Sequence, residues 1–160
     1  GVRYGKGLQL VNILRDLPRD LRMGRCYLPF DGLSEAGLQP SDLLRPEVEP
    51  RLRRLYHSYL DRAEAALAAG WAYTPSLPWR CARVRLASAW PVLIGMKTLA
   101  KMRAANVLEV ARRVKIGRRE VWGIVMRSVV TYPVPQIWRK LFKPNPSSPI
   151  KRVASQSILE

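Results

Sequence analysis

Apolar side chains recur every three or four residues over long parts of this chain, which is the pattern of helices that bury one face. Alternating runs of β-branched residues, which are typical of half-buried strands, are scarce. The spacing predicts four helical segments, over about residues 4–21, 46–69, 79–110 and 118–141. The expected fold class is therefore all-α.

Glycines and prolines predict where these helices end or bend. Gly24 is expected to stop the first helix and Gly70 the second. Pro91 is expected to bend the third helix, and the fourth is expected to break near Pro133. Residues 27–45, which are rich in Pro and Gly, predict a loop that holds short helical turns.

The first predicted helix carries a line of polar residues. Four of them follow one another at spacings of 3, 4 and 4 residues: Gln9, Asn12, Asp16 and Asp20. This spacing places all four on one face of a helix. Most of their neighbours are Leu, Ile or Val, so the line is expected in an apolar wall, where carboxylates need a partner. Mg²⁺ is such a partner, because it binds oxygen ligands and is often shared between carboxylates and substrate phosphates.

Spacing alone also allows a simpler interpretation, in which Asp16 and Asp20 are solvated and pair with arginines further along the same helix. Pro18 lies between them and removes one hydrogen bond, at a cost of about 3 kcal/mol in a regular helix. Either Asp16 caps a fresh helical turn there, or the helix kinks at this point.

The charge balance predicts an anionic partner. The chain has 28 Lys and Arg against 12 Asp and Glu, a formal net charge of +16. Nucleic acid, anionic lipid and phosphorylated small molecules are the classes that such a chain attracts. The two cysteines form no CxxC pair, and no apolar run reaches the ~18 residues of a membrane span. A cytoplasmic location is expected, and the basic surface leaves peripheral contact with a membrane open.

A basic helical module that binds a membrane surface or nucleic acid is the competing interpretation. The sequence shows no helix-turn-helix, RNP or zinc pattern. A line that includes two carboxylates also repels a phosphate backbone. No nucleic-acid partner is therefore expected.

Two stretches of sequence make the prediction more specific. LQLVNILRDLPRD at residues 8–20, with GRCYLP at 24–29, resembles the second aspartate-rich motif of the squalene/phytoene synthase family. That motif reads roughly LQ-x-x-N-[IL]-[IL]-R-D-x-x-x-D, followed by GR-x-Y-[LF]-P. WPVLIG at 90–95 and VKI at 114–116 resemble the C-terminal half of squalene synthases. Arg19 stands where the family often has Glu.

The resemblance implies an isoprenoid-synthase-type helical bundle, here a partial bundle lacking the N-terminal helices. Family members are Mg²⁺-dependent prenyltransferases that condense two prenyl diphosphates head to head and release diphosphate. Carried over by position, Asp16 and Asp20 are the catalytic residues, and together with Asn12 they are the metal ligands. The substrate-binding residues implied in the same way are Gln9, Arg15, Lys115 and Arg118.

The first aspartate-rich motif of the family is not found in the sequence. The nearest carboxylate pair, Asp61 and Glu64, is expected on the polar face of its helix. We therefore expect residues 1–141 to be the C-terminal part of a single isoprenoid synthase domain, inactive alone, and residues 142–160 to be a disordered tail. A non-catalytic relative is a further alternative.

The late segments favour a squalene synthase-like reaction on farnesyl diphosphate. Phytoene synthase-type activity on geranylgeranyl diphosphate is the alternative. NADPH becomes a second cofactor if squalene is the product.

Overall fold

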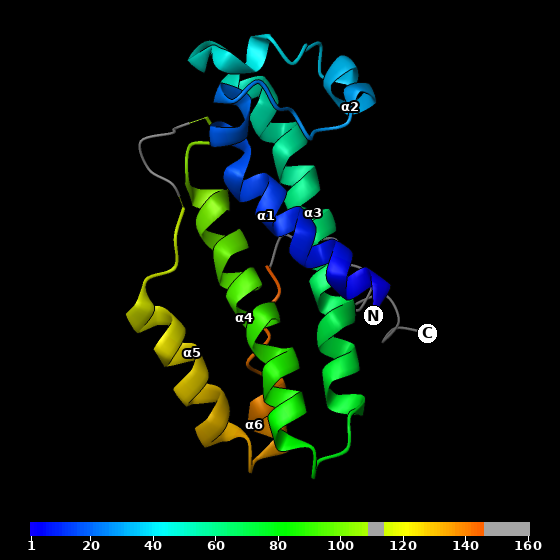
Figure 1. The fold of residues 1–160 in the computed structure, drawn as a ribbon, viewed down its shortest axis with the longest axis vertical. Helices are drawn as coiled ribbons and strands as arrows, with labels where there is room; N and C mark the ends of the chain where they lie inside the picture. Colours follow the sequence, from blue (N-terminus) through cyan, green and yellow to red (C-terminus); the bar gives the residue numbers. More distant parts are fainter. Residues whose placement is uncertain (109–113, 146–160) are drawn as a thin grey trace, which may run out of the picture.

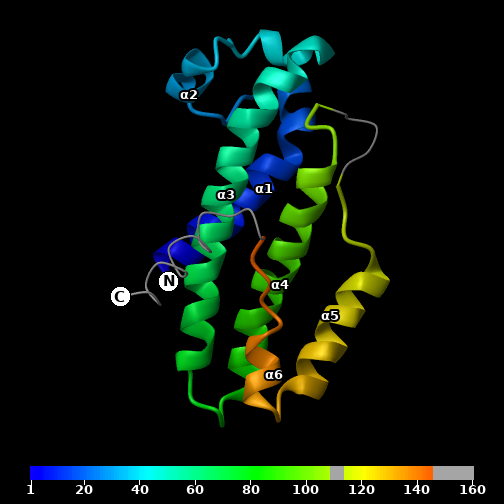
Figure 2. The same cartoon turned by 180° about the vertical axis from the view of Figure 1, so that it is seen from behind.

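Three long helices form the centre of the molecule. The computed structural model describes residues 1–108 and 114–145, which contain helices and loops and no strand. The helices α1 (Val2–Arg22), α3 (Glu49–Tyr73) and α4 (Ala82–Ala104) all contact one another (Figure 1). α5 (Arg118–Thr131) packs on α4 at the edge of this bundle, and α6 (Pro135–Arg139) follows it (Figure 2). The all-α prediction is confirmed.

Short helical elements join the long helices. α2 (Phe30–Glu35) and two 3-10 helices, η1 (Asp42–Leu44) and η2 (Pro46–Val48), connect α1 to α3. A third 3-10 helix, η3 (Thr74–Ser76), follows α3. Figure 1 shows α2 and its neighbours at one end of the bundle and α6 at the other.

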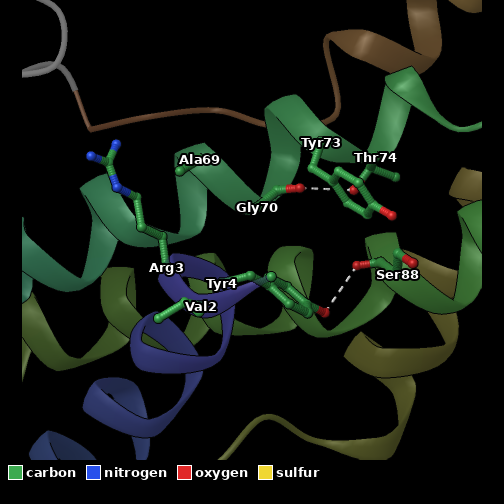
Figure 3. Close-up of a pocket in the computed structure, with 9 residues that line it drawn as sticks. Val2, Arg3, Tyr4, Ala69, Gly70, Tyr73, Thr74 and Ser88 are labelled. Atoms are coloured by element: carbon green, nitrogen blue, oxygen red, sulfur yellow. Dashed lines mark hydrogen bonds between the residues drawn. The ribbon is translucent and has the colours of Figure 1, made fainter.

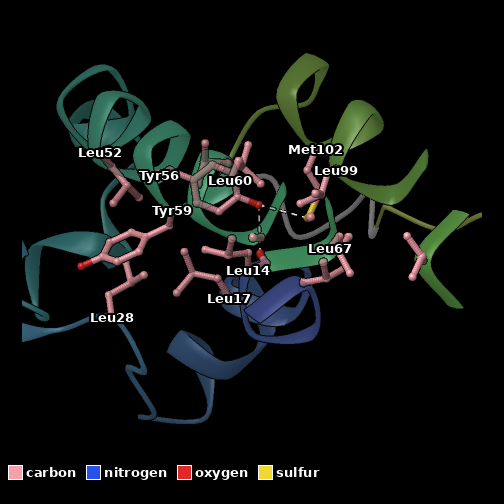
Figure 4. Packing of buried hydrophobic residues seen from close by; sticks show 14 of the residues in the cluster. Leu14, Leu17, Leu28, Leu52, Tyr56, Tyr59, Leu60, Leu67, Leu99 and Met102 are labelled. Atoms are coloured by element: carbon pink, nitrogen blue, oxygen red, sulfur yellow. Dashed lines mark hydrogen bonds between the residues drawn. The ribbon is translucent and has the colours of Figure 1, made fainter. Parts of the chain in front are cut away.

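The core lies where α1, α3 and α4 meet. The side chains that fill it are fully or almost fully buried (Figure 4): Leu14, Leu17, Leu52, Leu60, Leu67, Leu99 and Met102. Because α1 turns by 100° per residue, the residues opposite Leu14 and Leu17 point away from this core. Packing of the apolar face of α1 thus decides where its polar face points.

α1 continues through Pro18, although proline has no N–H to give to the carbonyl of Leu14. The hydroxyl of Tyr56, from α3, donates to that carbonyl oxygen at 2.9 Å and lies 3.3 Å from Sδ of Met102 (Figure 4). Burial raises the pKa of Tyr56, so the hydroxyl keeps its proton. The N-cap of α1 is Gly1, and Asp16 therefore does not cap a fresh turn.

The predicted stop at Gly24 is confirmed. Gly24 has φ of +72°, a backbone conformation that glycine adopts without strain. The N–H of Arg25 donates to the carbonyl of Asp20 at 2.8 Å, and the N–H of Gly24 donates to that of Leu21 at 3.0 Å. These bonds satisfy carbonyls at the end of α1, as in a Schellman turn.

Two predicted helix ends are wrong. Gly70 lies inside α3, which continues to Tyr73, and its missing side chain leaves room for the ring of Tyr4 from α1. α4 ends at Ala104, short of residue 110, and Pro91 lies inside it. The break near Pro133 is confirmed, because α5 ends at Thr131 and α6 begins at Pro135.

Glu64 is not on a polar face. Its side chain is 1% exposed, and the guanidinium of Arg103 from α4 contacts both Glu64, at 2.9 Å, and Asp61, at 2.6 Å. A carboxylate is stable there because it is paired and hydrogen-bonded. The ion pairs link α3 to α4, which explains why these acids do not form a second metal-binding motif.

Aromatic rings attach α6 to the bundle. The buried guanidinium of Arg85 lies 5.0 Å from the ring centroids of Trp79 and Trp138 and 5.6 Å from that of Tyr132. The expected tail, residues 142–160, starts close to this cluster. Phe142 stacks on Trp71 with centroids 5.7 Å apart. Residues 146–160 lie outside the described residues.

The link between Tyr56 and Pro18 can be tested by a double-mutant cycle. Tyr56→Phe leaves the buried carbonyl of Leu14 unpaired and is expected to lower the free energy of unfolding by about 1–3 kcal/mol. Pro18→Ala restores an N–H to that carbonyl, so Tyr56→Phe should cost clearly less in this background. Urea unfolding of the four proteins measures both values. An equal cost of Tyr56→Phe in the two backgrounds would contradict the assignment.

Candidate functional site

The polar line of α1 lies on the face opposite the core. Gln9 and Asn12 are exposed, whereas Asp16 and Asp20 are half-buried. The prediction that the line sits within an apolar wall is wrong, because the buried residues of α1 are on the other side of the helix. The shared face itself follows from the continuous helix across Pro18.

Arg15 holds the carboxylate of Asp16 with two parallel hydrogen bonds. Nε donates to Oδ1 at 3.1 Å and Nη2 donates to Oδ2 at 2.9 Å. The two side chains are 29% and 23% exposed, so water screens the pair only in part. The hydrogen bond to Asp16 raises the pKa of Arg15. Asp16 thus pairs with an arginine that is its sequence neighbour.

Arg15 and Lys115 line the same pocket. The pocket has a volume of about 330 Å³ and lies among α1, α4, the residues before α5 and α5 itself. Its lining residues are Arg15, Ile94, Thr98, Val114, Lys115, Ile116 and Val121. Two cations and no acidic residue line it, so an anion such as a phosphate group fits its charge.

Glu120 fixes the segment that carries Lys115. Its carboxylate accepts hydrogen bonds from the N–H of Gly117 at 2.9 Å and from Nζ of Lys101 at 2.6 Å, and Nζ of Lys97 lies 3.2 Å away. Lys101 also donates to the carbonyl of Lys115 at 3.2 Å. One carboxylate therefore connects α4, the start of α5 and the segment beside the pocket.

The surrounding donors stabilise the charged form of Glu120. The hydrogen bond from Lys101, the N–H of Gly117 and the second lysine lower its pKa to about 2. Glu120 was not among the site residues predicted from the sequence. The available signal was a glutamate three residues after a glycine at the start of a helix, a position that commonly accepts the N-cap N–H.

The remaining predicted residues do not line this pocket. Arg118 is exposed at the first turn of α5, and Gln9 and Asn12 are on the exposed face of α1. The structure thus brings Arg15, Asp16 and Lys115 into one neighbourhood and leaves Gln9, Asn12 and Arg118 exposed, while Asp20 is half-buried on the face of Asp16.

A second pocket lies at the other end of α1 (Figure 3). Its volume is about 430 Å³, and Tyr4, Tyr73, Thr74 and Ser88 are among its lining residues. The hydroxyl of Tyr4 donates to the carbonyl of Ser88 at 3.1 Å, and that of Thr74 donates to the carbonyl of Gly70 at 3.0 Å. This pocket is larger, but Arg3 is the one cationic side chain among its lining residues. The pocket of Arg15 and Lys115 has two cationic side chains and is therefore the stronger candidate for binding an anion.

The donors on α1 fit part of a magnesium site. Asp16 and Asp20 offer carboxylate oxygens and Asn12 offers an amide oxygen, all on one helix face. Over residues 1–108 and 114–145, no three acidic, His or Cys side chains gather closely enough to hold a metal ion alone. Mg²⁺ commonly takes one or two carboxylates and completes its shell with water and substrate phosphates. The donor set therefore suits Mg²⁺ that is shared with a phosphorylated ligand.

The chain is a helical bundle with an aspartate-rich motif on one of its central helices, as expected of the helical isoprenoid synthase fold. The squalene/phytoene synthase family matches residues 1–120, and the chain belongs to this family.

Curated relatives match parts of the chain. A chloroplastic phytoene synthase of an Oncidium hybrid cultivar is 38% identical over 88 residues, which are 55% of this chain and 20% of the relative. The presqualene diphosphate synthase of Zymomonas mobilis is 43% identical over 65 residues, 41% of this chain and 22% of the relative. The 15-cis-phytoene synthase of Enterobacter agglomerans is 38% identical over 98 residues, 61% and 31% of the two chains.

The matched part of this chain thus spans about a fifth to a third of the length of these relatives. No significant match to a solved structure was found. Within the described residues, no helix combines the length and the hydropathy that a membrane crossing requires.

Replacing Glu120 by Gln tests its part in the site. We expect faster amide hydrogen exchange over residues 115–121 at neutral pH, because the two lysines lose their charged partner. Glu47→Gln, at an exposed glutamate of η2, is the matched control and should leave exchange there unchanged. Because the folded-state pKa of Glu120 is about 2, the wild-type protection should persist above pH 4.5 and weaken as pH falls toward 2. Unchanged exchange in Glu120→Gln would contradict the role.

Proposed function

We propose that this chain supplies a diphosphate-binding part of a Mg²⁺-dependent head-to-head prenyl synthase. The observation that carries the proposal is that Arg15 and Lys115, 100 residues apart in sequence, line one pocket beside Asp16. Family membership supports it, because it implies prenyl diphosphate substrates. Residues 1–141 then act as the C-terminal part of one isoprenoid synthase domain, and a further aspartate-rich motif is needed for turnover.

Each residue of the site has a separate task in this proposal. Asp16 and Asp20, with the amide of Asn12, hold Mg²⁺. Arg15 orients the carboxylate of Asp16, and with Lys115 it binds oxygens of the diphosphate as negative charge develops on them. Mg²⁺ supplies further positive charge, which makes diphosphate a better leaving group. The apolar residues of the pocket, such as Ile94 and Val121, keep water away from the reacting carbon. Gln9 and Arg118 add contacts at the exposed side.

The finer parts of the proposal concern substrate and place of action. We propose farnesyl diphosphate as substrate, with NADPH consumed if squalene is the product, and geranylgeranyl diphosphate as the alternative. The names of the relatives include both reaction types, phytoene synthases and a presqualene diphosphate synthase. The excess of basic residues and the long apolar products favour action at the surface of a membrane.

Binding of inorganic pyrophosphate tests the site in this chain directly. Titration calorimetry with Mg²⁺ should show at least tenfold weaker binding for Arg15→Ala and for Lys115→Ala, because each removes a cation from the pocket. Lys140→Ala, at an exposed lysine directly after α6, is the control and should bind within about twofold of wild type. Asp16→Asn should remove the dependence on Mg²⁺. Normal binding by Lys115→Ala together with a loss of thermal stability would show a structural role instead.

A product assay tests the reaction itself. In a longer chain that also carries the first aspartate-rich motif, farnesyl diphosphate is expected to be consumed, with squalene formed when NADPH is present. Asp16→Asn should abolish turnover and keep the far-UV helix signal. Formation of phytoene from geranylgeranyl diphosphate alone would select the alternative substrate, and unchanged turnover by Asp16→Asn would contradict the metal role.

A further inference from the structure

The outer face of α5 and α6 is apolar and has no partner in the described chain. Trp122, Met126 and Val130 of α5 are 65%, 55% and 68% exposed. Spacings of four residues place these three on one face of the helix, and Val129 lies beside them. Ile137 of α6, which contacts α5, is 50% exposed as well. Single exposed apolar residues are ordinary, but a continuous stripe that includes tryptophan marks an interaction surface.

Basic residues surround this stripe. Between residues 114 and 145 the chain has seven Lys and Arg and one acid, Glu120, whose carboxylate is already paired with Lys97 and Lys101. Arg119 and Arg127 on α5, Arg139 on α6 and Lys140 directly after α6 are exposed. The surface therefore carries a local positive charge that its own residues do not neutralise.

A second exposed apolar region, around α2 and η1, differs from the stripe on α5 in the charge of the residues that surround it. Phe30 of α2 and Leu44 of η1 are 65% and 61% exposed, at the end of the bundle away from α6 (Figures 1 and 2). Residues 27–49 contain five acids and one arginine, but Arg51 and Arg54 of α3 line the same pocket as Glu35 of α2, so both signs of charge occur there. An anionic surface therefore attracts the stripe on α5, whose surroundings have an excess of cations, more strongly than the region around α2.

A cleft between α4 and α5 is likewise lined by apolar and cationic side chains. It has a volume of about 310 Å³ and lies between α4 and α5, where Met96, Ile124 and Leu141 form apolar wall. Arg127 and Lys143 line it as well. Apolar wall and unneutralised cations thus occur on both sides of α5.

From this combination we infer that the outer face of α5 and α6 docks on an anionic lipid bilayer, with Trp122, Met126 and Val130 entering the interface and the surrounding cations contacting lipid headgroups. The inference rests on the membrane contact in the proposed function and names the surface that makes it. It needs neither Mg²⁺ nor prenyl diphosphate, so it stands or fails separately from the diphosphate site. The stripe needs no transmembrane helix, since an interfacial helix lies in the plane of the membrane surface.

Vesicle binding by the 160-residue chain tests the inference. Vesicles of phosphatidylglycerol and phosphatidylcholine, without Mg²⁺ or prenyl diphosphate, should bind the wild type at least tenfold more tightly than vesicles of phosphatidylcholine alone. Val130→Glu should weaken binding to the anionic vesicles at least tenfold. Leu44→Glu, which introduces the same negative charge at a similarly exposed apolar position near α2, should stay within twofold of wild type.

A second readout covers the case in which Val130→Glu perturbs the fold. Brominated lipids should quench tryptophan emission of the bound wild type, and Trp122→Phe should remove most of this quenching while binding persists. Absence of wild-type binding, equal loss in the two glutamate variants, or quenching that Trp122→Phe leaves unchanged would overturn the inference. A wild-type dimer that Val130→Glu converts to a monomer, without vesicle binding, would assign the face to a second copy and overturn it as well.

Discussion

The hydroxyl of Tyr56 completes α1 at the point where Pro18 interrupts it. Without that donor, the carbonyl of Leu14 would be a buried acceptor with no partner, and the helix would have reason to end or bend between the two aspartates. With it, one continuous helix buries Leu14 and Leu17 and turns Asp16 and Asp20 to the same opposite face. The position of the motif thus depends on a side chain from α3, outside the motif itself.

Charge pairing organises the other half of the site. Lys115 comes from a segment with no regular structure, and backbone hydrogen bonds of a helix cannot place it. Glu120 takes over that task by binding the N–H of Gly117 and two lysines of α4, one of which also binds the carbonyl of Lys115. Because a half-exposed pair in water is worth little alone, the effect depends on several donors sharing one carboxylate.

Periodicity and spacing predicted the all-α fold, the stop at Gly24, the break at Pro133 and the shared face of the aspartates, because these depend on local backbone geometry. Contacts between helices could not be predicted in this way, because they depend on how distant parts of the chain pack. Gly70 is of the residue type that commonly ends a helix, yet it lies inside α3, where its missing side chain leaves space for the ring of Tyr4. Glu64 has the position of a surface acid, yet Arg103, 39 residues away, pairs with it in the interior. Glu120 was recognisable as a helix-start residue, but its two lysines depend on how α5 packs on α4.

In the proposed site, the aspartates of α1 and Lys115 together hold a divalent cation and a diphosphate. Paramagnetic broadening by Mn²⁺ in the presence of pyrophosphate measures this directly by NMR. We expect broadening that is centred on the amides of Asp16 and Asp20 and that extends to the amide of Lys115, which lies 95 residues after Asp20 in the sequence. Broadening centred instead on the acidic residues of α2 and η1, with the amides of α1 and of Lys115 unaffected, would contradict it.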